Sequence, residues 1–156
     1  EWFRQRQVDP ADWDMSVEEF LGTWPDATRT HSSLTLHLDT TGRQVLPQVH
    51  LGLARIEHAW QLPAWLDFGG WNECPSAEIH CALHREWQSR YGAEIVGVSS
   101  DILECQVRNP PGDRDSAIEL VWQMFAYCPD LLQGGGSLSE LAAGLMQARH
   151  WFFWWD

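Results

Sequence analysis

Apolar residues recur every three to four positions in four stretches of the chain, a pattern typical of amphipathic helices. The stretches are 16–24, 76–91, 116–128 and 137–150. Three of them open with a capping box, a serine followed three positions later by a glutamate; the pairs are Ser16–Glu19, Ser116–Glu119 and Ser137–Glu140. In the remaining stretch Ser76 suits the N-cap, and Gly92 follows where many helices end in a left-handed residue. The pattern predicts three helices and a short fourth one near the N-terminus.

Alternation of apolar and polar residues predicts strands elsewhere. Residues 34–38 and 49–56 alternate in this way and predict a hairpin-like pair. Residues 93–108 predict two further strands, and the tight Ser-Ser-Asp turn between them makes this pair antiparallel. In the second of these strands one face is expected to carry Leu103, Cys105 and Val107, and the other Glu104, Gln106 and Arg108.

The last six residues, WFFWWD, predict a strand made almost entirely of aromatic residues. Alternation places Trp151, Phe153 and Trp155 on one face, and Phe152 and Trp154 on the other. Aromatic residues on both faces are typical of a central strand that is covered on both sides. We therefore expect this strand to lie in the core.

The order of these elements predicts an α+β fold. A chain of 156 residues suits a single domain, 1–156, with an N-terminal helical segment at 1–30 and an α+β core at 31–156. The core is expected to be a mainly antiparallel sheet packed against three to four helices. The first residue is Glu1 rather than Met, so an upstream part of a longer protein is a further possibility.

The net charge of −12 changes the expectation about partners. All ten basic residues are arginines, and a surface this acidic repels phosphate groups, so we expect neither nucleic acid nor membrane as a partner. A basic protein is the better match. No apolar run is long enough to span a bilayer, which favours the cytoplasm, and the four cysteines lack a CxxC pair and are expected to be free thiols.

Five blocks of sequence carry a resemblance to a known family. They are GGWNECP (69–75), WQSRYGAEIVG (87–97), DILECQVRNPP (101–111), YCPD (127–130) and WFFWWD (151–156). In this order they resemble the bacterial domain-of-unknown-function family 4253, over roughly the last two thirds of the chain. The resemblance implies no activity, because none is assigned to the family as a whole.

The GGWNECP loop and the helix after it contain the residues best suited to chemistry. Cys74 lies just before a helix N-terminus, where a thiol pKa is often lowered, and His80 or His84 could act as its base. The two histidines are also spaced to share a metal ion, but the helix lacks the glutamate of the HExxH motif. The alternative is that Cys74 and both histidines are core residues. We therefore assign no catalytic residue, no metal and no cofactor.

Eleven tryptophans in one domain suggest a second kind of site. An aromatic wall with carboxylates beside it can bind a cation, a sugar or a peptide. The alternative is a tryptophan-rich core closed by the terminal strand, which the strand periodicity already explains. The candidate binding residues from the two arguments are Trp71, Asn72, Glu73, Cys74, His80, His84, Asp130, Trp151, Trp154, Trp155 and Asp156.

Two hypotheses about function follow from these patterns. The first is a non-catalytic protein-binding module, of accessory or immunity type, whose acidic and aromatic surface engages a basic protein. The second is a small enzyme or small-molecule-binding protein with a pocket between the GGWNECP loop, the His80/His84 helix and the C-terminal tryptophans. An exposed patch that combines acidic and aromatic residues would support the first, and an open pocket beside Cys74 would support the second.

Overall fold

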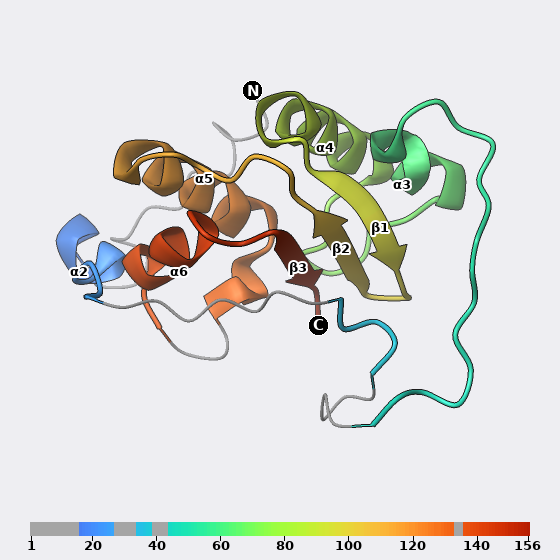
Figure 1. Cartoon of the computed structure of the whole chain (residues 1–156), viewed down its shortest axis with the longest axis horizontal. Coiled ribbons are helices and arrows are strands. Elements are labelled where there is room, and N and C mark those ends of the chain that lie inside the picture. The colour runs from blue at the N-terminus through green and yellow to red at the C-terminus, as the bar shows by residue number, and fades with distance from the viewer. Residues whose placement is uncertain (1–15, 27–33, 39–43, 133–135) are drawn as a thin grey trace.

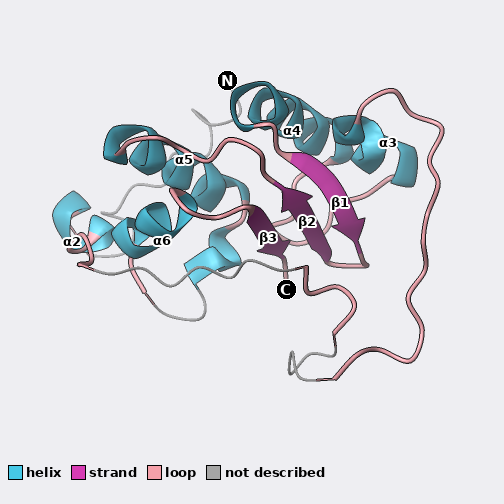
Figure 2. Cartoon of the chain, in the orientation of Figure 1, coloured by secondary structure: helices cyan, strands magenta, loops and turns pink. Residues whose placement is uncertain are grey.

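A computed structural model describes residues 16–26, 34–38, 44–132 and 136–156 of the chain. At its centre is an antiparallel sheet with the strand order β1-β2-β3 (Figures 1 and 2). The strands are β1 (Glu94–Val98), β2 (Ile102–Gln106) and β3 (His150–Trp154). The tight turn at 99–101 joins β1 to β2, so the predicted antiparallel pair at 93–108 is confirmed.

Two long helices cover one face of the sheet, namely α4 (Ala77–Tyr91) and α5 (Arg114–Tyr127). Trp87 of α4 stacks on Phe153 of β3 with ring centroids 5.7 Å apart, and Tyr127 of α5 meets the same ring edge-on at 5.0 Å. The side chains of Leu103 and Cys105 point into this layer and are fully buried. The hydrophobic core therefore lies between this face of the sheet and the two helices.

Smaller helices surround this core. α2 (Val17–Leu21) and α6 (Leu138–Leu145) pack near each other at the α5 side, while α3 (Leu62–Leu66) packs against α4 (Figure 1). Short 3-10 turns, η2 (Ala59–Gln61) and η3 (Pro129–Leu132), complete the described helices. The α+β fold class is thus confirmed. No helix in the described ranges is long and apolar enough to cross a bilayer.

The C-terminal strand is buried on one face, as predicted, but it is an edge strand and not a central one. Trp151, Phe153 and Trp155 are buried in the core, whereas Phe152 on the other face is 40% exposed. β3 pairs with β2 alone among the described strands. The prediction of a central strand with both faces covered was wrong. Aromatic content reveals neither how many strands pair with this strand nor whether a second layer covers its outer face.

The predicted hairpin of 34–38 with 49–56 was also wrong. Leu38 forms a single bridge with Val45, which lies between the two stretches. Residues 49–56 are extended and have no strand partner among the described residues. Leu51 and Leu53 are 94% and 92% exposed. Alternating leucines therefore did not indicate burial here, because neither of these two leucines is covered by a helix or sheet in the described part of the chain.

Helix ends were predicted less well than helix positions. The capping boxes at Ser16–Glu19 and Ser137–Glu140 are present. The predicted box at Ser116–Glu119 is not, because α5 begins earlier and the Asp113 carboxylate accepts a hydrogen bond from the Ser116 amide at 2.8 Å. α2 ends at Gly22 rather than at Pro25, and α6 ends well before residue 150.

Candidate functional site

The predicted loop and the C-terminus do lie together. The Asn72 side chain donates a hydrogen bond to the main-chain carbonyl of Asp156 at 2.7 Å, and the Asp156 amide donates to the Asp130 carboxylate at 3.1 Å. Asn72 adopts a positive φ of 44°, a conformation that asparagine tolerates better than most residues. Trp155 lies beside this junction and donates its indole N–H to the Tyr127 carbonyl at 3.3 Å.

Five buried side chains form a continuous series of polar contacts behind the loop. The Cys74 Sγ lies 3.4 Å from His80 Nε2, and His80 Nδ1 lies 2.6 Å from the Tyr127 hydroxyl. The same hydroxyl lies 2.9 Å from His84 Nε2, and His84 Nδ1 is 3.7 Å from the Cys105 Sγ. We call this series the Cys–His–Tyr chain. Its members come from the loop, α4, α5 and β2.

One distribution of protons satisfies the two histidines, Tyr127 and Cys105. The imidazole of His80 donates to the Pro75 carbonyl, so its Nδ1 is free to accept the Tyr127 O–H. A hydroxyl has one hydrogen, so His84 must donate its Nε2–H to the Tyr127 oxygen. His84 Nδ1 then accepts from the Cys105 thiol. Both histidines are neutral in this arrangement.

Burial keeps the Cys–His–Tyr chain uncharged at neutral pH. Loss of solvation lowers the pKa of His80 to about 4. The same cause, with repulsion from His80 in second place, lowers the pKa of His84 to about 3. Burial also raises the pKa of Cys105 and of Tyr127 well above their usual ranges. The Cys–His–Tyr chain is therefore a set of neutral hydrogen bonds, not a charged acid–base pair.

Aromatic rings enclose these polar groups. Phe68 and Trp155 meet the His80 ring edge-on at centroid distances of 5.1 and 5.3 Å, and Trp87 meets His84 at 5.1 Å. Both histidines are completely buried. Side chains thus fill the junction where the second hypothesis placed a pocket, and a nucleophilic Cys74 would have no room for a substrate. The described residues contain no group of three or more metal-binding side chains.

The candidate tryptophans do not form one site. Trp71 and Trp155 both contact Phe68, but Trp151 packs on the far side of the core against Tyr91, with ring centroids 5.7 Å apart. Trp154 lies on the opposite face of β3, where its indole donates to the Asp101 carboxylate at 3.0 Å. The described contacts of these rings are mostly with the core, as the core interpretation expected.

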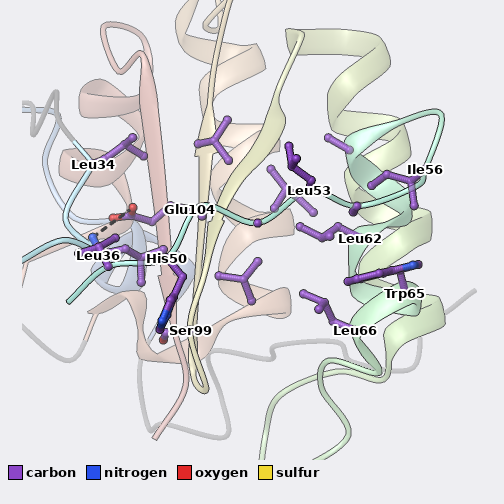
Figure 3. A pocket seen from close by; sticks show the side chains of 18 of the residues that line it. Leu34, Leu36, His50, Leu53, Ile56, Leu62, Trp65, Leu66, Ser99 and Glu104 are labelled. Carbon is purple, nitrogen blue, oxygen red and sulfur yellow. Dashed lines mark hydrogen bonds between the residues drawn. The ribbon is translucent and has the colours of Figure 1, made fainter.

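A large hollow lies elsewhere, along β1. It has a volume of about 790 Å³ and is bordered by the extended segment 48–58, by α3 and by β1 (Figure 3). We call it the β1 hollow. Its lining includes all residues from Ile95 to Ser99, together with Leu53, Leu62 and Trp65. The sequence pattern did not predict this hollow, because it indicated a strand at 49–56.

Exposed apolar side chains gather around the β1 hollow. Leu53 and Trp65, which line it, are 92% and 56% exposed, and Val49, Leu66 and Val96 are exposed as well. Single exposed apolar residues are common on soluble proteins, but a contiguous group of this kind usually marks a place where another molecule binds. In Figure 3 the Leu53 side chain comes from the extended segment, and those of Leu62, Trp65 and Leu66 come from α3.

A buried carboxylate forms part of the wall of the hollow. Glu104 of β2 is fully buried and accepts hydrogen bonds from the Thr35 amide at 2.7 Å and from the Thr35 hydroxyl. It also accepts one from the Leu36 amide at 3.4 Å (Figure 3). His150 Nε2 lies 3.8 Å from the same carboxylate. Burial lowers the pKa of His150, while the charge of Glu104 opposes that shift. The bonds from 35–36 therefore replace the water that Glu104 would otherwise bind.

Alternation predicted Glu104 on the same face of its strand as Gln106 and Arg108, but it did not predict that this face is covered at Glu104. Glu104 does lie on that face, but the segment around Thr35 covers it. One signal was available in the sequence, since Gly97 pairs with Glu104 across the strands and a glycine within a strand often marks a close approach. A Cβ atom at Gly97 would lie 2.4 Å from Leu36 Cδ1.

Comparison with known families is decisive for one conclusion. Residues 50–156 match the family described as Domain of unknown function (DUF4253). The chain belongs to this family. The DUF4253 match covers β1, β2, β3, α3 to α6 and most of the β1 hollow, whereas α2 and the residues around Thr35 lie before it. No curated protein and no solved structure matches the chain.

Proposed function

We propose that the chain is a non-catalytic protein-binding module, of accessory or immunity type, and that its partner binds in the β1 hollow. The observation that carries the proposal is the group of exposed apolar side chains around the hollow, which includes Leu53 and Trp65. Large apolar and aromatic side chains contribute most of the energy at protein interfaces, and they do so when a partner removes them from water.

The charge of the chain supports a basic partner. The chain carries −12 at neutral pH, and the exposed charged side chain in the described lining of the β1 hollow is the carboxylate of Glu57, with no arginine beside it. Opposite charges accelerate association and disfavour partners of the wrong sign. A partner with both apolar and positively charged groups on its binding surface fits these two properties together.

The experiment uses two leucines that differ in one respect only. Leu51 and Leu53 are almost equally exposed and two positions apart, but only Leu53 is among the residues that line the hollow. The tagged full chain, Leu53→Ser and Leu51→Ser are each used to capture proteins from an extract of the host at low salt, with quantification by mass spectrometry. We expect a basic protein that wild type and Leu51→Ser retain equally, and that Leu53→Ser binds about tenfold more weakly.

The two variants also control for folding. Both side chains are in water already, so each substitution should change the free energy of unfolding by less than about 0.5 kcal/mol. Equal retention of the partner by both variants would place the binding site outside the hollow and contradict the proposal. The second hypothesis, a pocket beside Cys74, has no observation in its favour, because His80, His84 and Trp155 are buried at that junction.

A further inference from the structure

Among the described strands the sheet has two open edges, at β1 and at β3, and the β1 hollow follows the first of them. β1 is the first strand in the order β1-β2-β3, so β2 is its one strand neighbour in the described part of the chain. Five consecutive residues, from Ile95 to Ser99, line the hollow. Since successive side chains of a strand point to opposite faces, a hollow that touches all five must run along the edge of the strand.

An edge strand presents main-chain N–H and C=O groups that another extended chain can bind. In β1 a bulge between Ile95 and Gly97 leaves Val96 without a partner on β2, and Val96 is exposed at the hollow. The extended segment 48–58 lies across the hollow but forms no strand with β1. Proteins with such an edge beside an apolar groove commonly bind a peptide by adding it to the sheet as a further strand.

The groups around the edge restrict what such a peptide contains. Leu53 of the extended segment and Leu62 and Trp65 of α3 offer apolar contacts, and the exposed Glu57 near them adds negative charge. A second copy of this chain is a poor occupant, because each copy carries −12 and the two would repel each other. A positively charged partner is attracted by the same negative charge.

We propose that the partner inserts an extended segment of alternating apolar and basic residues into the hollow and pairs it with the free edge of β1. This inference rests on the proposed function and adds the chemistry and the conformation of the bound segment. β1 has five residues, so about five residues of the partner, spanning roughly 17 Å, pair with it. Main-chain bonds then hold the segment, and its alternate side chains contact Leu53 and Trp65 on one side.

In the test, a terminally blocked heptapeptide of alternating arginine and valine is titrated into the full chain. Binding is followed by nuclear magnetic resonance, together with the hydrogen exchange rates of the β1 amides. We expect slowed exchange in 94–98, and we expect N-methylation of alternate peptide residues to weaken binding by at least about tenfold, because it removes the donors that pair with the edge. A heptapeptide of alternating glutamate and valine is the charge control and should not bind.

Two variants of the same exposed position separate the sign of the charge from the loss of the valine. Val96→Arg should weaken binding of the arginine–valine peptide, whereas Val96→Glu, which also replaces valine by a longer charged side chain but with the opposite sign, should preserve or strengthen it. Both are compared by circular dichroism to confirm that the sheet is intact. Equal effects of the two substitutions would overturn the basic character of the bound segment.

The outcomes distinguish this inference from the function on which it rests. If the peptide shifts the signals of Leu53 and Trp65 but N-methylation has no effect and the β1 amides stay unprotected, strand addition is wrong while binding in the hollow stands. If the peptide does not bind at millimolar concentration, the inference about an alternating basic segment is wrong. The comparison of Leu53→Ser with Leu51→Ser then decides the proposed function independently.

Discussion

Tyr127 shows how a single residue determines the state of the groups around it. Its hydroxyl contacts His80 Nδ1 at 2.6 Å and His84 Nε2 at 2.9 Å, so it is the hydrogen-bond partner of two buried imidazoles at once. The i, i+4 spacing of the two histidines suggested a shared metal ion, but what they share is a hydrogen-bond partner, the Tyr127 hydroxyl. No local pattern predicts this contact, because Tyr127 lies 47 and 43 positions from the two histidines.

Replacing Tyr127 should therefore cost more than the size of the removed group suggests. Tyr127→Phe leaves two buried histidine nitrogens without a partner and is expected to lower the free energy of unfolding by about 2–4 kcal/mol, measured by urea denaturation. Tyr91→Phe is the matched control, because the buried Tyr91 hydroxyl has no hydrogen-bond partner among the described residues. It should be neutral or slightly stabilising. Equal losses in the two variants would show that the Cys–His–Tyr chain contributes nothing specific.

The lowered pKa values of the two histidines predict a dependence of stability on pH. In the unfolded chain histidine titrates near its ordinary value of about 6.5, whereas in the fold the pKa of His80 is about 4 and that of His84 about 3. Between these values the unfolded state binds more protons, so the stabilisation is complete above pH 6.5 and is lost as the pH falls. We expect a loss approaching about 1.4 kcal/mol per pH unit for each histidine, measured by urea denaturation from pH 7.5 to 5. A free energy of unfolding that stays constant over this range would contradict buried neutral histidines.

At the scale of elements, the sequence predicted those structures whose signals are local. Capping boxes and apolar periodicity located α2, α4 and α6, and the tight turn correctly made β1 and β2 antiparallel. Tertiary relations were not predicted. The edge position of β3, the cover over Glu104 and the exposure of 49–56 all depend on which segments lie beside one another. The candidate site was also predicted only in part. The loop and the C-terminus do meet, but buried side chains fill the space between them where a pocket was considered.

The loop before α4 contains two glycines that test how tightly this element is packed. Both Gly69 and Gly70 have a positive φ, but a Cβ at Gly69 would lie 2.0 Å from the Pro75 carbonyl oxygen, whereas a Cβ at Gly70 would meet nothing within 4 Å. Gly70→Ala should therefore cost only the conformational penalty, about 1 kcal/mol, and Gly69→Ala at least about 3 kcal/mol. Thermal unfolding of the two variants measures the difference. Similar melting temperatures would mean that the loop is free to move away from α4.

For the whole molecule, the distribution of polar and apolar groups separates structure from binding. The polar groups near Cys74 are buried, neutral and almost fully satisfied, which is what a stable core requires. The apolar groups near β1 are exposed, which no stability argument explains. The net charge of −12 then favours a basic partner, and its binding is expected to weaken as salt screens the attraction.

The most direct measurement of the central claim is hydrogen–deuterium exchange of the full chain, free and bound to the basic partner captured from its host. Binding in the β1 hollow predicts slower exchange in 48–58, in α3 and in β1, with little change in 69–75 and at the C-terminus. Protection confined to 69–75 and 151–156 would contradict the account and return the binding site to the loop and the terminal tryptophans.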